Sequence, residues 1–457
     1  MKTNVSIILT AFCIFPTIVA QRQKLNVLFI FADQWRAQAM GYNGDINAQT
    51  PNFDAFAQKE INFVNTFSCQ PVSSPYRASL LTGQYPTTHG LVANDLPLAP
   101  NEQTFGELFK QAGYKTGYIG KWHLFGHGRL DFIPAEKRFG FDFWKVMNCT
   151  HAYNESDYWP EYEQKMRWKG YDAFAQTDTM LQFIADAHKE GKPFCMVLSW
   201  GPPHDPYAMA PEEYKSLYAD KKKIVLRPNV DTIAQPASRT MLSGYYAHIA
   251  ALDFKFGEII MRLKEMGVYD NTIIVFTSDH GDMIGSQGYV KKSRPYDESI
   301  HVPFLLHYPA EKLPKAIIEP MSTPDILPTL LDLCGLQIPS KIEGRSYLPF
   351  VTGKKQQTDE GALVMWPLIR KGYNLNEYRC LRTTRYTYVE ELTGPTMLYD
   401  NEIDPYQRKN LVNIPEYVSI QKLMKKKLQD ARKRANDDFL SDVDVRKKFG
   451  LEMNILE

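Results

Sequence analysis

The 457-residue sequence has almost no excess of either charge, because 53 lysine and arginine residues are balanced by 52 aspartate and glutamate residues. A net charge of +1 argues against a nucleic-acid partner held by bulk electrostatic attraction. Cysteine is also scarce, with six residues and no Cys-x-x-Cys pair, which argues against a zinc ribbon or a redox dithiol. The sequence contains no internal repeat and no low-complexity tract.

A long, uninterrupted hydrophobic run is missing as well. The apolar stretch from Val5 to Ala20 is broken by Pro16, and it falls short of the about 20 apolar residues that a membrane span needs. A lysine before the stretch and polar residues after it are typical of an export signal. We therefore expect residues 1–20 to be a signal peptide, and the mature protein to be periplasmic or secreted without stable membrane insertion.

The sequence does have enough apolar material for a large core, with 44% hydrophobic and 13% aromatic residues. Short apolar runs that are typical of buried strands alternate with helical segments. The predicted strands are residues 26–31, 114–119, 193–198 and 272–276, and the predicted helices include residues 104–112 and 254–266. This alternation predicts an α/β fold whose large mixed, mostly parallel sheet is covered by helices on both faces.

The C-terminal part of the sequence has a different pattern. Residues 381–389 and 397–400 alternate as strands of an antiparallel sheet do, and a basic run at 425–434 lies on what we predict to be the final helix. A solvated helix face is the preferred interpretation of that run. We expect a catalytic α/β domain over residues 21–355 and a smaller α+β subdomain over residues 356–457.

Polar side chains follow each of the predicted parallel strands. In chain order these residues are Asp33, Gln34, Lys121, His123, His204, Asp279 and His280. A single aspartate after a strand is most often a turn or cap residue, and a single histidine is more often a core residue. Since ligands of α/β sheets collect beyond the carboxyl ends of the strands, however, this repeated pattern favours one shared site.

The residue types at these strand ends favour a hard divalent cation. Asp33, Gln34 and Asp279 offer oxygen atoms, which suit Ca²⁺ or Mg²⁺, and His280 offers one nitrogen. Zinc is the alternative, because aspartate and histidine also bind zinc. No cluster of three histidines at metal-binding spacing supports it.

Residues 73–83, Ser-Ser-Pro-Tyr-Arg-Ala-Ser-Leu-Leu-Thr-Gly, predict a short capped helix. Ser74 is a suitable N-cap, Pro75 suits the first helical position, and Gly83 can end the helix. Ser73 would then stand just outside a helix N-terminus, where free N–H groups and the helix dipole favour an anion, with Arg77 nearby. The plain alternative is an ordinary capped helix after a loop.

This motif resembles the signature around the modified residue of type I sulfatases, which belong to the alkaline-phosphatase-like superfamily. In that family a cysteine, or in many bacterial members a serine, is oxidised to formylglycine (3-oxoalanine), so the resemblance implies this change at Ser73. Cys69 does not fit the motif, because the arginine and the Leu-Thr-Gly segment are then out of register. For a serine, the resemblance also implies a partner, a radical-type formylglycine-generating (anaerobic sulfatase-maturating) enzyme.

The resemblance extends to the strand-end residues and covers nearly the whole mature chain. In the family, the pairs that match Asp33-Gln34 and Asp279-His280 bind calcium, together with an oxygen of the modified residue at position 73. Many members have aspartate where this chain has Gln34 and asparagine where it has His280. The glutamine lowers the negative charge of the site.

A catalytic mechanism is also implied by the resemblance. One hydroxyl of hydrated formylglycine attacks the sulfur, activated by the metal and Asp279, and the second hydroxyl later expels the sulfate. The other implied roles are sulfate binding by Lys121 and Lys292, protonation of the leaving oxygen by His204, acceptance of a proton by His123 and orientation of the diol by Arg77. Because Lys291 is adjacent, the choice of Lys292 rests on its register to Tyr296.

The expected substrate is a sulfated carbohydrate, such as a glycosaminoglycan, mucin or algal glycan fragment. Two other functions stay open: a phosphatase or phosphodiesterase of the same superfamily that uses Ser73 directly, and a glycan-binding protein with an inactive site. Polar or aromatic residues close to the motifs are candidate sugar contacts, namely Trp35, Arg36, His89, Asn94, His127, Tyr207 and Arg294.

Overall fold

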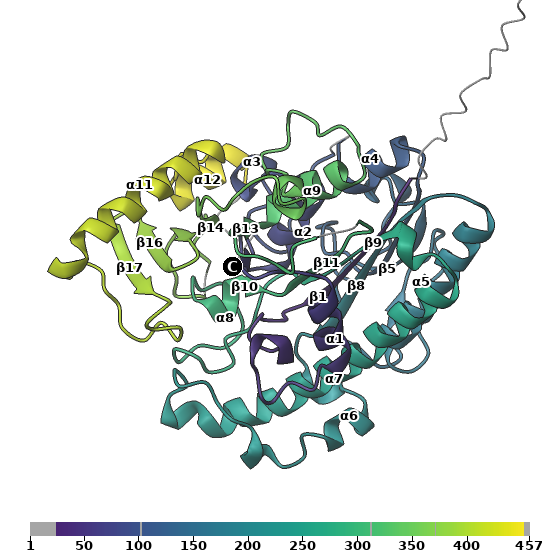
Figure 1. Cartoon of the computed structure of the whole chain (residues 1–457), viewed down its shortest axis with the longest axis horizontal. Coiled ribbons are helices and arrows are strands. Elements are labelled where there is room, and N and C mark those ends of the chain that lie inside the picture. The colour runs from purple at the N-terminus through teal and green to yellow at the C-terminus, as the bar shows by residue number, and fades with distance from the viewer. Residues whose placement is uncertain (1–23, 101–102, 311–312, 371, 452–457) are drawn as a thin grey trace, which may run out of the picture.

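The structure is a computed structural model that describes residues 24–100, 103–310, 313–370 and 372–451, so the predicted signal peptide lies outside the described residues. A large sheet crosses the middle of the protein (Figure 1). Its strands are β1 (Asn26–Asp33), β2 (Ile61–Phe63), β4 (Lys115–Lys121), β5 (Phe143–Met147), β8 (Phe194–Pro203), β9 (Thr272–Ser278), β11 (Phe304–His307) and β12 (Ala316–Ile317). They are arranged in the order β12-β2-β11-β9-β1-β8-β4-β5.

The predicted parallel strands are β1, β4, β8 and β9, and they lie next to one another in the middle of this sheet. The pairs β9-β1, β1-β8, β8-β4 and β4-β5 are parallel, while β11 is antiparallel to both of its neighbours. The prediction of a mixed, mostly parallel sheet is therefore confirmed. Each of these strands runs further toward its carboxyl end than predicted, so that Asp33 and Lys121 are the last residues of their strands.

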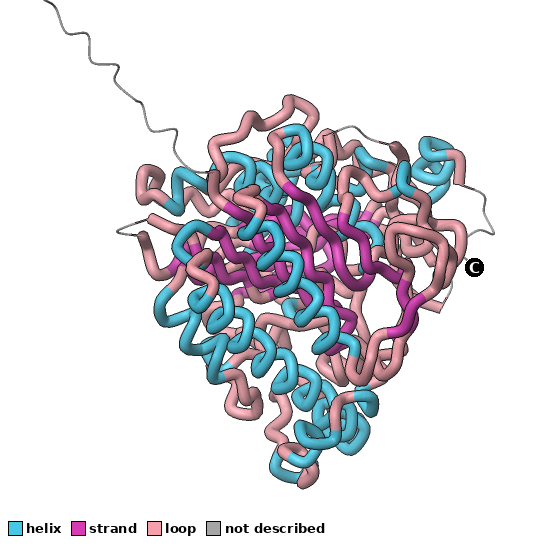
Figure 2. Tube along the Cα trace, turned by 90° about the vertical axis from the view of Figure 1, so that its right-hand side faces the viewer, coloured by secondary structure: helices cyan, strands magenta, loops and turns pink. Residues whose placement is uncertain are grey.

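Helices cover both faces of the sheet (Figure 2). Helices α2 (Ser73–Thr82), α4 (Phe105–Gln111) and α9 (Ile326–Leu333) share a core with Val27, Phe29 and Phe31 of β1. Helices α1 (Pro51–Lys59), α5 (Asp172–Lys189) and α7 (Gln235–Glu265) pack on the other face, with Leu28 and Ile30. The strand is buried on both faces, as strands of parallel sheets are.

Two of the predicted helices correspond to helices of the structure. The helix over 104–112 is confirmed as α4, which begins with a capping box between Thr104 and Glu107. The helix over 254–266 is only the last part of the longer α7. Gly244 weakens the helical pattern upstream, but a Cβ there would lie 2.3 Å from the carbonyl oxygen of Tyr207, so close packing requires glycine inside this helix.

Helix α2 differs from the prediction at its start. It begins at Ser73, and the cap residue Val72 has no side chain that could bond the free N–H groups. The Ser74 hydroxyl donates instead to the carbonyl oxygen of His123 at 2.6 Å, so the prediction of Ser74 as the N-cap is wrong. Ser73 is thus the first residue of the helix. Gly83 ends the helix as predicted, with φ +65°.

A second, antiparallel sheet follows toward the C-terminus and confirms the predicted change of pattern. It consists of β14 (Ala362–Trp366), β15 (Tyr378–Arg382), β16 (Tyr386–Glu391) and β17 (Gly394–Asp400), with α11 (Val418–Arg434) packed on it. Residues 381–389 belong to two strands, β15 and β16, rather than to one. The basic run lies on α11, but α12 (Asp442–Phe449) follows, so the prediction that it lies on the final helix is wrong.

Small elements complete the described chain. The remaining strands are β3 (Thr66–Phe67), β6 (Asp157–Tyr158), β7 (Met166–Arg167), β10 (His301–Val302) and β13 (Met321–Ser322), and the remaining short helices are α3 (Pro86–His89), α6 (Glu212–Ser216), α8 (Asp297–Ile300) and α10 (Leu348–Val351). Within the described ranges, no helix has the length and the apolar character that crossing a membrane requires.

Candidate active site

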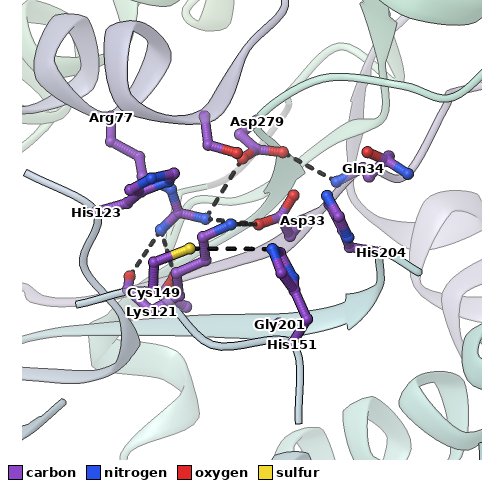
Figure 3. A network of polar contacts seen from close by, with 12 residues as sticks. Asp33, Gln34, Arg77, Lys121, His123, Cys149, His151, Gly201, His204 and Asp279 are labelled. Atoms are coloured by element: carbon purple, nitrogen blue, oxygen red, sulfur yellow. Dashed lines mark hydrogen bonds and ion pairs between the residues drawn. The ribbon is translucent and has the colours of Figure 1, made fainter. Parts of the chain in front are cut away.

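The carboxyl ends of the central strands bring the predicted polar residues to one edge of the sheet (Figure 3). Asp33 ends β1, Lys121 ends β4, and Asp279 follows β9 directly. The chain turns sharply after β1, where Gln34 has φ +69° and its backbone N–H donates to Asp279 Oδ1 at 2.9 Å. This turn joins the two aspartates that the sequence places far apart.

Arg77 of α2 lies among these strand ends and is almost fully buried, with 1% exposure. Its Nη1 donates to the carbonyl oxygen of Lys121 and to Ser199 Oγ, both at 2.7 Å. Its Nη2 lies 3.4 Å from Asp33 Oδ2 and 3.4 Å from Asp279 Oδ2. The guanidinium therefore ties the helix to three strands and sets a fixed positive charge beside two buried carboxylates.

Lys121 is the second cation of this cluster, and its Nζ lies 2.5 Å from Asp33 Oδ2. Burial raises the pKa of Asp33, but the charges of Lys121, His204, Arg77 and Lys292 outweigh this effect and hold that pKa well below its usual range. Asp33 is thus an ionised carboxylate in the interior. Buried charges of this kind persist only where they are paired or bind a metal ion.

Asp33, Asp279 and His280 offer ligand atoms that all lie within 4.8 Å of one another. The second oxygen of Asp33, Oδ1, is buried without a hydrogen-bond partner in the described part of the chain. His280 Nδ1 lies 3.0 Å from the carbonyl oxygen of Gly281, which assigns the proton to Nδ1 and leaves the Nε2 lone pair facing the carboxylates. Burial lowers the pKa of His280 to about 4, which also leaves this nitrogen free to bind a metal ion. The donor set therefore fits a divalent cation.

Ser73 lies beside this cluster at the start of α2. Its Oγ is 3.3 Å from His280 Nε2, and the residue is 1% exposed. The N–H groups of the first helical turn and Arg77 make its surroundings favourable for an anion. The neighbouring N–H of Ser74 is bonded to Asn94 Oδ1 at 2.9 Å.

Gln34, His204 and Lys292 form the other side of the site. Lys292 Nζ donates to Gln34 Oε1 at 2.7 Å and lies 2.8 Å from His204 Nε2. His204 Nδ1 is 2.8 Å from the carbonyl oxygen of Asp205, so the ring carries its proton on Nδ1 and accepts from Lys292 at Nε2. Burial lowers the pKa of His204 well below its usual range, and nearby Lys292 adds to this effect.

His123 lies at the margin of the cluster, joined to it through the contact of its carbonyl oxygen with Ser74. Its Nε2 is 3.0 Å from Asp95 Oδ1, and Arg129 bonds both oxygens of that aspartate. Cys149 is close by in Figure 3. Burial raises the pKa of this thiol, but the charges of Lys121 and His123 outweigh it and lower the pKa to about 6.

Several residues of the site have no signal in the predicted strand ends. The ring of His151 stacks on that of His204, with centroids 4.2 Å apart, and the two rings point into the site side by side (Figure 3). Asp282 Oδ2 accepts a hydrogen bond from Gln34 Nε2 at 2.7 Å. Burial raises the pKa of Asp282, while the hydrogen bond from Tyr207 and the charge of Arg36 lower it. Asp282 could have been found from the sequence because it closes the segment Asp-His-Gly-Asp, and His151 could have been found had β5, which ends four residues before it, been predicted as a strand.

The predicted sugar contacts fare unevenly. Trp35 is fully buried between Phe53 and Phe276, and Arg36 is buried with its Nη1 on the carbonyl oxygen of Asp282, so neither offers a surface to a sugar. The sharp turn after β1 directs these two side chains into the core, so their role as sugar contacts stays a prediction that their burial does not support.

The other predicted contacts are at least partly exposed or belong to networks of the protein. His89 bonds Ser79 Oγ at 2.9 Å, Asn94 bonds Ser74, and Tyr207 donates to Asp282. Arg294 donates to the carbonyl oxygens of Tyr373 and Asn374. His127 is exposed and contacts the ring of Phe125, with centroids 4.9 Å apart. Unlike the other four side chains, that of His127 makes no hydrogen bond or ion pair within the described part of the chain.

Comparison with known proteins gives the chain a family context. Residues 25–336 match the family model described as sulfatase, and residues 285–434 match a second model, described as the C-terminal part of N-sulphoglucosamine sulphohydrolase. The chain is 40% identical over 432 residues to an ulvan-active sulfatase of Formosa agariphila, covering 93% of this chain and 84% of that protein. It is 31% identical to an endo-4-O-sulfatase of Bacteroides thetaiotaomicron, covering 87% and 90%.

Solved structures share the same architecture. One, from work on the metabolism of multiple glycosaminoglycans by Bacteroides thetaiotaomicron, has a TM-score of 0.83 at 28% identity and covers 91% of this chain and 97% of its own. A phosphonate monoester hydrolase of Agrobacterium radiobacter has a TM-score of 0.72 at 23% identity, covering 90% and 96%. The second likeness concerns the fold alone.

Proposed function

Because this chain belongs to the sulfatase family, as its match to the sulfatase model over residues 25–336 shows, we propose that it removes O-sulfate groups from a carbohydrate at the site around Ser73. The protein is a sulfuric ester hydrolase. The observation that carries the proposed site is the position of Ser73, at a helix start beside the buried Asp33–Asp279–His280 cluster and Arg77. Ser73 would be converted to formylglycine in the active enzyme.

A calcium ion would be held by Asp33, Asp279 and His280, with Gln34 and the modified residue 73 as further ligands. The unpartnered Oδ1 of Asp33 and the oxygen-rich donor set support this proposal. When bound, the ion supplies positive charge that the sulfate oxygens and the nucleophile need. Magnesium fits the same donors, and titration with each ion in turn distinguishes the two.

Formylglycine supplies, as its hydrate, an oxygen nucleophile and a second hydroxyl with which the sulfate is later released. The residues of this chain would do the rest. Lys121 and Lys292 lie on different sides of the cluster, and their ammonium groups would hold the sulfate oxygens, while Arg77 fixes the modified side chain. An unmodified serine lacks the second hydroxyl and would be trapped as a sulfate ester.

The proton for the leaving sugar oxygen would come from the contact between Lys292 and His204. Lys292 Nζ lies 2.8 Å from His204 Nε2, so a proton would pass from the ammonium to this ring nitrogen and from His204 to the leaving oxygen. This transfer leaves Lys292 as a neutral amine that can still donate N–H bonds to the sulfate. On the opposite margin, His123 would accept the proton of the second hydroxyl, with Asp95 holding its ring. Proton donor and acceptor would then lie on opposite sides of Ser73.

The proposed substrate class is a sulfated carbohydrate. It follows from the relatives, one described as an ulvan-active sulfatase and another as an endo-4-O-sulfatase. Export through the predicted signal peptide at residues 1–20, and maturation by a radical-type enzyme before or during export, complete the proposal. The division into residues 21–355 and 356–457 is supported by the separate sheet that begins with β14.

The decisive experiment is to express the protein with and without an anaerobic sulfatase-maturating enzyme. Mass spectrometry of the peptide with Ser73 should show the loss of two hydrogens only after coexpression, and sulfate release from sulfated mono- and disaccharides should appear only in that sample. Ser73→Ala is the control. An intact serine together with hydrolysis of phosphate or phosphonate esters would favour instead a phosphatase or phosphodiesterase that uses Ser73 directly, a function compatible with the shared fold.

A further inference from the structure

Asp282 is fully buried. Within the described part of the chain, its carboxyl group accepts a hydrogen bond from Gln34 and makes none with the other predicted metal ligands. Its Oδ2 accepts a hydrogen bond from Gln34 Nε2 at 2.7 Å and another from the Tyr207 hydroxyl. Its Oδ1 accepts the backbone N–H of Ile284 at 3.2 Å. All three neighbours donate, so the carboxyl group acts as an acceptor on each of these sides.

The Gln34 amide is held between partners of opposite kind. Its nitrogen donates to Asp282 Oδ2 at 2.7 Å and, at a longer distance of 3.5 Å, to Asp205 Oδ1, while Lys292 Nζ donates to its oxygen at 2.7 Å. Since a carboxylate can only accept and an ammonium can only donate, these partners fix which end of the amide is which. The oxygen of Gln34 therefore faces Lys292 and the site, which is the orientation that a metal ligand requires.

The same contact bears on the charge of the site. Gln34 is neutral at a position next to Asp33, where a carboxylate would add a negative charge to the cation-binding cluster. Asp282 places a carboxylate directly behind that neutral amide, at hydrogen-bond distance from it. The negative charge is thus present in the structure, one amide group further from Asp33 and Asp279.

We infer that Asp282 is a positioning residue for the metal site, which holds the Gln34 amide with its oxygen toward the site and supplies through that amide the negative charge that Gln34 lacks. Partners behind a metal ligand that orient it in this way affect metal affinity about ten- to hundredfold. The inference rests on the proposed function, because the ion belongs to it. It concerns residues of this chain that are already in contact.

The test is a double-mutant cycle that exchanges the two kinds of side chain, Asp282→Asn and Gln34→Glu. In the double variant, the introduced asparagine can donate to the introduced carboxylate and still accept from Ile284, while Lys292 donates to the other oxygen of that carboxylate. Each single variant breaks the pattern. In D282N the new NH₂ group must face either the Gln34 amide nitrogen or the Ile284 N–H, and both of these are donors. In Q34E the new carboxylate faces the carboxylate of Asp282. The net charge of the double variant equals that of the wild type.

Ca²⁺ binding is measured by calorimetry, and melting temperature in EDTA, on protein with unmodified Ser73, so that no turnover is needed. We expect D282N to bind Ca²⁺ at least tenfold more weakly than the wild type, Q34E to melt at a lower temperature in EDTA, and the double variant to recover both properties. Asp142→Asn, which removes an exposed charge paired with Lys110, should match the wild type. Ca²⁺ affinity of D282N within twofold of the wild type would overturn the inference.

A double variant no better than D282N would overturn it as well. If D282N alone does not fold, a folded, Ca²⁺-binding double variant supports the inference and an unfolded one refutes it. Wild-type protein that binds no Ca²⁺ would remove the proposed metal site and this inference together. Calcium binding by a wild type that releases no sulfate after maturation would instead count against the proposed function alone.

Discussion

Replacing Arg77 by alanine removes the guanidinium that lies between Asp33 and Asp279. The side chain is 1% exposed, so water cannot take its place without a rearrangement of the core. Two hydrogen bonds of 2.7 Å to Lys121 and Ser199 are lost, each of which contributes about 1 kcal/mol. The larger loss comes from the two carboxylates 3.4 Å away, since removing one partner of a buried ion pair costs about 3–5 kcal/mol.

These contributions overlap, and we expect the free energy of unfolding to fall by about 4 kcal/mol, a large part of the roughly 5–15 kcal/mol that stabilises a folded protein. Urea unfolding in EDTA, followed by circular dichroism, measures this change. Arg77→Lys should lie between wild type and alanine, because one ammonium group cannot replace the four contacts of the guanidinium. Added Ca²⁺ should reduce the deficit of R77A, since a cation then faces Asp33 and Asp279 again.

Arg262→Ala is the matched control, because Arg262 is half exposed and pairs with Glu265 on the surface of α7. Its loss should change the free energy of unfolding by no more than about 0.5 kcal/mol. If R77A in EDTA is as stable as R262A, Arg77 does not hold the buried carboxylates and the electrostatic account of the site is refuted. A deficit of R77A that is the same with and without Ca²⁺ would refute the metal part of that account.

Three further predictions concern pH, the histidine pair and the ion. Burial raises the pKa of Asp172 from an unfolded value near 3.9 to about 7 in the folded protein, so this group costs stability as pH rises from about 4 to 7. Asp172→Asn should therefore be more stable than the wild type at pH 8, by up to roughly 4 kcal/mol, and no more stable at pH 4; equal differences at the two pH values would contradict this. If His151 acts by stacking on His204, His151→Phe should retain more of the wild-type kcat in sulfate release than His151→Ala, and equal losses would show that the ring edge of His151 is needed instead. At a free Ca²⁺ concentration of a hundred times the Kd for Ca²⁺, removing the ion with EDTA should lower the free energy of unfolding by about 2.7 kcal/mol. An unchanged melting temperature would argue against a bound ion.

The sequence was sufficient for the four central parallel strands of the sheet and for the polar residues that follow them. Strands such as β1 and β9 are buried on both faces, so their apolar runs are visible without any knowledge of their partners. The polar residue that ends each run must lie at the same edge as the others when the strands are parallel. This reasoning needs only local sequence and strand direction, which is why Asp33, Lys121 and Asp279 were placed together correctly.

The failures have other physical causes. Ser74 has the right chemistry for a helix cap, but its hydroxyl finds an acceptor in the carbonyl oxygen of His123, which lies 49 residues further along the chain. Trp35 follows two site residues in sequence, yet the positive φ of Gln34 directs the chain so that Trp35 enters the core. Contacts between distant segments decide these two cases, and no local pattern encodes them. His151 lies in the loop that follows β5, a parallel strand that was not among the four predicted from the sequence, so its place at the same edge was missed.

The charges of the site explain why a glutamine is tolerated at position 34. The buried Arg77 and Lys121 and the partly exposed Lys292 bring three positive charges to a site at which Asp33 and Asp279 bring two negative charges. Asp282, behind Gln34, supplies the third, so the inner cluster is neutral before any ion binds. The proposed divalent cation would then leave the cluster positive by about two charges, which would favour binding of the anionic sulfate ester. A carboxylate at position 34 would repel Asp282 and add one more negative charge, and the neutral Gln34 beside Asp282 avoids both.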